Sequence, residues 1–161
     1  MTDAPGDVLP FRRPPIRQST LVRSDVAHTF EVFVGTIARW WPLRPYSIGQ
    51  GRVTDVVLER EVGGLVYEVW DDGRTVTWGR LLAWEPPARF VLTWELLPAV
   101  TEVELSFTSV RPSLTRVDVE HRGWEALTEE QLLAATGAAG GYSAGWAAIL
   151  TAFATAVEAA P

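Results

Sequence analysis

The order of its segments is the feature that most constrains how this chain folds. Several strand-like stretches follow one another between residues 53 and 120, and one long helical pattern comes last. Within the later stretches, Val103, Leu105 and Phe107 alternate with polar residues, as in an antiparallel sheet that is wet on one face. Consecutive strands are joined by hairpins, which favours the α+β class over a parallel sheet. The sequence therefore predicts a curved antiparallel sheet of about six to seven strands wrapped around a long C-terminal helix.

A first helix is predicted before these strands. Residues 16–22 alternate in part and predict a strand. Ser24 or Asp25 can then cap a helix by accepting from the free N–H groups of its first turn. The helix is expected to close at Trp40-Trp41-Pro42, because proline cannot continue it.

The C-terminal helix carries its own start signal. Thr128-Glu129-Glu130-Gln131 fits a capping box. Several glycines between residues 137 and 141 predict a kink or a break. Beyond them a buried stripe runs at spacings of three and four residues through Tyr142, Trp146, Ile149, Phe153 and Val157.

The Asp72-Gly73 pair predicts a two-residue hairpin turn, because both positions tolerate the positive φ of a type I′ turn. Counting outward from it pairs Tyr67 with Trp78 and places both rings on the inner face of the sheet. Glu68 then falls on the outer face, away from any site.

The same count turns Arg80 inward and puts it opposite Trp94, with Leu82 opposite Leu92. A buried guanidinium needs a partner, which here is either the Trp94 ring or an anionic ligand. The alternative is a bulge at Gly79, which would turn Arg80 outward.

Composition sets the class of protein. The 161 residues suit one domain, with residues 1–15 as a flexible lead-in and residues 16–161 as the folded unit. A net charge of -6 argues against nucleic acid as a partner. No apolar run reaches the roughly 18 residues of a membrane span, and the absence of a signal-peptide pattern predicts a cytoplasmic protein. The chain has no cysteine, which excludes disulfides and thiol chemistry.

Two motifs could carry acid–base or nucleophilic chemistry. The G-x-S-x-G pattern at residues 141–145 matches a nucleophile elbow, but no histidine follows Ser143 and helical residues precede it. His121 shares a face with Val119 and therefore points inward, either as a general base or as a structural histidine bonded to the backbone. His28 lies far from His121 in the sequence, so neither a metal site nor a cofactor is expected.

Short motifs rich in Trp and Gly are spread over residues 16–158: Trp40-Trp41-Pro42, Gly63-Gly64, Asp72-Gly73, Trp78-Gly79-Arg80, Trp84-Glu85-Pro86-Pro87, Thr93-Trp94, His121-Arg122-Gly123-Trp124 and Gly145-Trp146. Together they resemble the homologues of the heat-shock-protein-90 ATPase activator, within the START-like (SRPBCC) superfamily. This resemblance implies the helix-grip fold. Members of the superfamily bind lipids and polyketides, act as aromatases or cyclases, confer resistance by self-sacrifice, or assist chaperones.

Three functions follow as hypotheses. The first is a non-enzymatic binder of a small, largely apolar molecule, aromatic or polyketide-like, in a Trp-lined cavity. The second is a cyclase or dehydratase with His121 as the acid–base group, and the third is a co-chaperone or protein-interaction module. A core simply filled by tryptophan is the alternative to a cavity, and the oligomeric state is left open. The residues predicted to line the cavity are Trp41, Tyr67, Trp78, Arg80, Trp94, His121, Tyr142 and Trp146.

Overall fold

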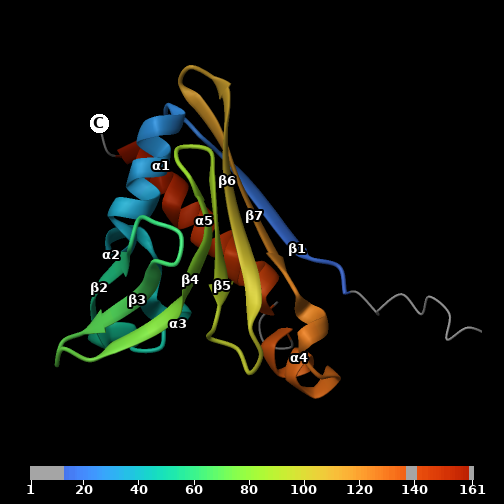
Figure 1. Cartoon of the computed structure of the whole chain (residues 1–161). Helices are drawn as coiled ribbons and strands as arrows, with labels where there is room; N and C mark the ends of the chain where they lie inside the picture. Colours follow the sequence, from blue (N-terminus) through green and yellow to red (C-terminus); the bar gives the residue numbers. More distant parts are fainter. Residues whose placement is uncertain (1–12, 137–140, 160–161) are drawn as a thin grey trace, which may run out of the picture.

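The computed structural model describes residues 13–136 and 141–159, which form a curled sheet with helices on its inner side (Figure 1). The predicted lead-in lies outside these ranges up to residue 12, and so does most of the predicted helix break, at residues 137–140. The elements in chain order are β1 (Ile16–Val22), α1 (Val26–Gly35), α2 (Ile37–Trp40), α3 (Leu43–Tyr46), a 3₁₀ turn (Gln50–Arg52), β2 (Val53–Leu58), β3 (Leu65–Trp70), β4 (Thr75–Glu85), β5 (Arg89–Trp94), β6 (Thr101–Arg111), β7 (Leu114–Arg122), a second 3₁₀ turn (Trp124–Ala126), α4 (Glu129–Thr136) and α5 (Gly141–Ala159).

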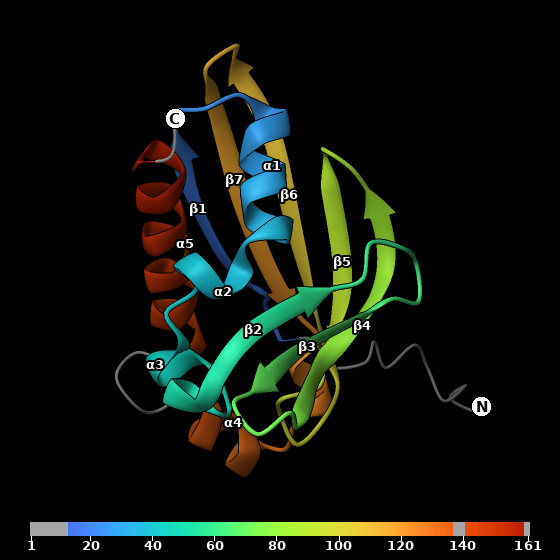
Figure 2. The ribbon, with the colours of Figure 1, turned by 90° about the vertical axis from the view of Figure 1, so that its left-hand side faces the viewer.

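The seven strands form one sheet in the order β1-β7-β6-β5-β4-β3-β2, and all neighbouring pairs are antiparallel. The sheet curls so that α5 runs alongside β1 while α1 lies over the inner face of β6 and β7 (Figure 2). This arrangement confirms the predicted α+β class and the helix-grip fold. None of the helices in the described ranges has the length and apolar character needed to cross a membrane.

Both predicted helix starts are present. The Asp25 carboxylate accepts from the backbone N–H of His28 at 2.8 Å and caps α1. Ahead of α4, the Thr128 hydroxyl accepts from the N–H of Gln131 at 3.1 Å, and the Gln131 amide oxygen accepts from the N–H of Thr128 at 3.0 Å. This reciprocal pair is the predicted capping box.

Phenylalanine rings fill the middle of the space between the sheet and the helices. The Phe33 ring centroid lies 4.9 Å from that of Phe153 in α5 and 5.7 Å from that of Phe90 in β5. Phe30 packs in the same way on Phe107, at 5.1 Å. The void that remains beside this cluster measures about 20 Å³, room for about one water molecule. The centre of the fold is therefore packed rather than hollow.

The predicted register of the β3–β4 hairpin is wrong by one residue near its turn. The turn holds three residues instead of two, since the N–H of Trp70 donates to the carbonyl of Arg74 and Gly73 has a φ of 86°. Tyr67 consequently pairs with Thr77 on the outer side. Glu68, predicted to face outward, is fully buried. A one-residue slip moves every side chain to the opposite face.

Bulges in β4 explain the remaining differences. Trp78 is the extra residue opposite β3, and the chain there passes so close to the carbonyl of Thr93 that only Gly79 leaves room. Past the bulge Arg80 points outward and is exposed. The open alternative of a bulge at Gly79 is thus the correct one, and the predicted inward position of Arg80 is wrong. A second bulge pairs Leu81, rather than Leu82, with Leu92.

Candidate functional site

A cavity of about 300 Å³ opens at the end of the molecule where α3 and α4 lie. Its walls come from the segment around α3, from the end of β5, from α4 and from the first three turns of α5. Five of the lining side chains are aromatic, and none carries a charge: Trp41, Pro45, Tyr46, Ser47, Ile48, Trp94, Leu96, Ala135, Gly141, Tyr142, Gly145, Trp146 and Ile149. A cavity of this size and character is typical of a small-molecule site.

The three indoles of the wall are each held by a hydrogen bond at the ring edge. The N–H of Trp41 donates to the carbonyl of Tyr46 at 2.7 Å, and that of Trp146 donates to Nδ1 of His121 at 3.0 Å. The N–H of Trp94 donates to the Tyr142 hydroxyl at a longer 3.4 Å. Because the donors are engaged, the indoles offer the cavity mainly apolar ring surface.

Tyr142 supplies the main polar group of the wall. Its hydroxyl oxygen accepts from Trp94, and its own proton has no acceptor among the described residues. Burial raises the pKa of Tyr142, although the bond from Trp94 partly opposes this. The hydroxyl therefore stays protonated at neutral pH and is free to donate to a ligand.

Trp41, Trp94 and Trp146 also line the small central void of 20 Å³. They therefore stand between the open cavity and the packed centre. Trp78 contacts this inner void and not the open cavity, with its ring centroid 4.9 Å from that of Trp41. Its predicted place on the inner face is correct, but it lies behind the wall.

His121 lies inside, as predicted, but does not line the cavity. Its Nδ1 accepts from Trp146, so the proton is on Nε2, which lies 2.7 Å from the Thr101 hydroxyl. Burial lowers the pKa of His121 to about 3, which keeps the ring neutral. With both nitrogens engaged, His121 is a structural histidine, bonded to side chains rather than to the backbone carbonyl that the sequence suggested.

The predicted site residues therefore separate into three groups. Trp41, Trp94, Tyr142 and Trp146 meet around the open cavity. Trp78 and His121 stand behind its wall. Tyr67 and Arg80 lie on the outer side of the sheet, away from it.

Sequence reasoning missed the contribution of residues 45–48. This segment begins at Pro45 in an irregular stretch and has no periodic pattern that assigns a face to Tyr46. One signal was present in the helix stripe, where Gly145 lies three residues after Tyr142 and so falls on the same buried face. A Cβ atom at Gly145 would come within 3.2 Å of the Tyr46 ring, so the glycine marks a close approach of another segment.

The G-x-S-x-G pattern at residues 141–145 forms the start of α5. The Ser143 hydroxyl accepts from the side-chain amide of Gln18 at 3.0 Å. His121 is fully engaged elsewhere and cannot activate it. The motif is therefore structural, in agreement with the sequence interpretation.

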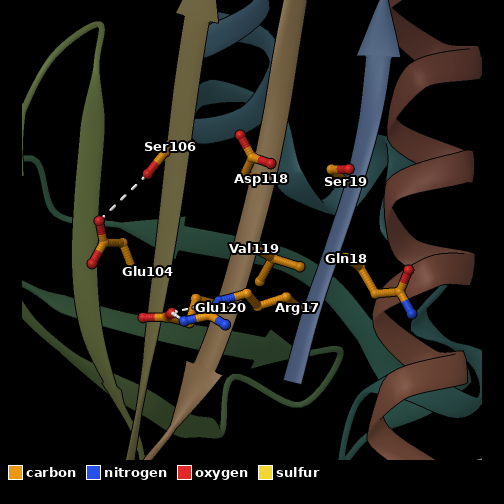
Figure 3. Close-up of a pocket in the computed structure, with 8 residues that line it drawn as sticks. All are labelled: Arg17, Gln18, Ser19, Glu104, Ser106, Asp118, Val119 and Glu120. Carbon is orange, nitrogen blue, oxygen red and sulfur yellow. Dashed lines mark hydrogen bonds and ion pairs between the residues drawn. The ribbon is translucent and has the colours of Figure 1, made fainter. Parts of the chain in front are cut away.

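A larger, polar depression of about 550 Å³ lies over β1, β7 and β6 (Figure 3). Its charged groups are paired, since Arg17 binds Glu120 at 2.8 Å and Asp118 binds Arg116 at 2.9 Å, and Ser106 donates to Glu104 at 3.4 Å. Neighbouring Arg122 bridges Glu104 and Glu120 on the same face. It is the solvated outer face expected of the sheet, and Val119 is the one apolar residue among those that line it.

The fold and the end cavity define a helix-grip protein with an apolar pocket of small-molecule size. The model of the family described as Activator of Hsp90 ATPase homolog 1-like protein matches residues 27–158, from α1 to the last turn of α5, and the chain belongs to this family. The resemblance seen in the sequence is thereby confirmed.

Several solved structures are similar over nearly the whole chain. The anthrahydroquino-γ-pyrone synthase Txn09 is 29% identical, with 88% of this chain and 97% of that chain covered and a TM-score of 0.57. The self-sacrificing resistance protein CalC from Micromonospora echinospora is 25% identical, with 90% and 94% covered and a TM-score of 0.63. CalU16 from the same organism, at 21% identity with 93% and 82% covered and a TM-score of 0.59, supports the fold alone. No curated protein matches the sequence.

Proposed function

We propose that this protein binds a small, largely apolar molecule with aromatic rings in the end cavity. The observation that carries the proposal is the wall itself: five aromatic side chains and no charged group line a cavity of about 300 Å³. Planar rings pack against indoles and phenols with favourable offset or edge-to-face geometry.

The lining chemistry narrows the ligand to a neutral one. A carboxylate or ammonium group placed among these side chains would lose its hydration without gaining an ion pair, which is unfavourable. A carbonyl group suits the wall better, because the Tyr142 hydroxyl has a proton to donate. The name of the 29%-identical synthase describes a fused-ring quinol with a pyrone, which supports a polycyclic oxygenated ligand here.

Of the alternatives, a cyclase or dehydratase with His121 as acid–base group has no support from the geometry. His121 is neutral, fully bonded and separated from the cavity by Trp146. A co-chaperone role is suggested by the family description, and no feature of the cavity requires it. We therefore retain binding as the proposed function.

The test places a larger side chain in the cavity by substitution of one lining residue. Ala135 lines it, whereas the adjacent Ala134 points to solvent from the same helix. Wild type, Ala135→Phe and Ala134→Phe are titrated with anthraquinone, flavone, N-phenyl-1-naphthylamine and palmitate, and both tryptophan fluorescence and the melting temperature are followed. Saturable quenching with a rise in melting temperature is expected for the neutral aromatic compounds. Binding should be lost in Ala135→Phe and kept in Ala134→Phe; equal binding by all three proteins would refute the proposal.

A further inference from the structure

We propose that Glu68 is a positioning residue for the cavity: its carboxylate fixes the segment of residues 43–50 that forms one wall. This inference rests on the proposed function and assigns a role to a buried charged side chain that does not touch the ligand space. It identifies the group on which the shape of that wall depends.

The wall segment has little regular structure of its own. α3 contains only four residues, and the backbone of Arg44 within it is not helical. The Ser47 hydroxyl donates to the carbonyl of Leu43 and accepts from the N–H of Gln50, so these bonds stay within the segment. Pro45, Tyr46, Ser47 and Ile48 nevertheless line the cavity. Their position must therefore be set by groups outside the segment.

Two side chains from outside supply polar anchors. The Trp41 indole donates to the carbonyl of Tyr46 at 2.7 Å. Glu68 lies in β3, and its Oε1 accepts from the N–H of Ile48 at 3.0 Å and from the N–H of Gly49 at 3.3 Å. At Gly49 the backbone also lies against the Trp70 ring so closely that a side chain would collide with it. Glu68 therefore ties the far end of the wall to the sheet.

The choice of a carboxylate at this position is not explained by packing. Glu68 is the single fully buried carboxylate among the described residues. Its neighbours in the sheet are apolar, because Val56 lies opposite it on β2 and Val66 lies two positions before it on β3. Burying a carboxyl group is unfavourable unless it is hydrogen-bonded. Its second oxygen has no partner in the described part of the chain, so the bonds to Ile48 and Gly49 are the interaction that a valine could not provide.

The test separates positioning from general stability. Glu68→Gln keeps a carbonyl oxygen that can accept both bonds, while Glu68→Leu keeps the bulk and loses them. Val56→Ala is the matched control. Val56 lies opposite Glu68 on β2, so the substitution weakens the same part of the core without removing either hydrogen bond. The probe is N-phenyl-1-naphthylamine, followed by its fluorescence, together with amide hydrogen exchange of Ile48 and Gly49.

We expect the probe to bind Glu68→Gln within about twofold of wild type, and Glu68→Leu about tenfold more weakly, with faster exchange of both amides. Val56→Ala should melt at a lower temperature and keep its affinity. Unchanged affinity and exchange in Glu68→Leu, or an equal loss of affinity in Val56→Ala, would overturn the inference. If wild type itself does not bind the probe or any neutral aromatic compound, the proposed function fails, while the exchange data still decide whether Glu68 fixes the segment.

Discussion

The space between the sheet and α5 is filled differently at its two ends. Around α1, ring centroids lie near 5 Å apart, with Phe30 on Phe107 of β6 and Phe33 on both Trp40 of α2 and Phe153 of α5. Around α3, Trp94 and Trp146 also lie in contact, at 5.4 Å, yet a cavity remains beside them. At the packed end, regular elements bring their rings together, whereas at the other end the irregular segment of residues 45–48 forms one wall and leaves the space beside the indoles open.

The largest effect is expected at the packed end. Phe153 is fully buried against Phe33 and Trp40, so Phe153→Ala should lower the free energy of unfolding by about 3–5 kcal/mol. Urea denaturation measures this change. A loss below about 1 kcal/mol would mean that this end is not close-packed, and the contrast between the two ends would fail.

The next effect concerns the histidine that holds Trp146. The unfolded chain binds a proton at His121 below its ordinary pKa of 6.5, whereas burial lowers the folded pKa to about 3. The stabilisation is therefore complete above pH 6.5 and is lost as the pH falls toward 3. Between pH 7.5 and 5 this group should account for roughly 2 kcal/mol of the wild-type decline in unfolding free energy.

His121→Leu should remove that component and flatten the pH dependence of stability. Urea denaturation at a series of pH values gives both curves, with a leucine at His28, the chain's other histidine, as the control for loss of a histidine elsewhere. Parallel curves for wild type and His121→Leu would show that His121 is not held neutral in the fold.

A smaller effect is expected from the Tyr142 hydroxyl in the cavity wall. Tyr142→Phe removes the proton available to a ligand carbonyl and should weaken anthraquinone binding about threefold to tenfold. Tyr67→Phe is the same change on the outer side of the sheet and should leave the affinity unaltered. Fluorescence titration compares the two, and an equal response would place the ligand elsewhere.

The smallest effect is expected at Arg80, which the sequence placed inside unless a bulge at Gly79 turned it outward. Arg80→Ala should change neither the anthraquinone affinity nor the unfolding free energy by more than about 0.5 kcal/mol, because the side chain is exposed. A large loss of affinity would mean that Arg80 contacts the ligand, and it would contradict the outward position that the bulge gives this side chain.

The sequence correctly predicted the features that depend on residue periodicity and on local capping. Alternation and helical spacing located the sheet and the stripe of α5, and local cap chemistry located the starts of α1 and α4. Periodicity also placed Tyr142 and Trp146 on one face of α5, where both line the cavity.

Prediction from the sequence failed where a single inserted residue changes the face of the sheet on which the following side chains lie. Tyr67, Glu68 and Arg80 were misplaced because the turn at Gly73 holds one more residue than predicted and because β4 bulges at Trp78. The prediction counted with a strict period of two and a two-residue turn, and this count by itself detects neither the extra turn residue nor the bulge. The wall around Tyr46 could not be predicted either, since an irregular segment is positioned by distant groups such as Glu68.

The central claim, that a ligand lies among the bonded indoles and not in the packed half, is tested most directly by the indole N–H signals in NMR. The protein is titrated with N-phenyl-1-naphthylamine, and the side-chain resonances of its eight tryptophans are followed. We predict saturable shifts for Trp41, Trp94 and Trp146, with Trp84, which packs on Phe30 and Phe90, unmoved. Shifts centred on Trp84, or no saturable shift at all, would contradict the account.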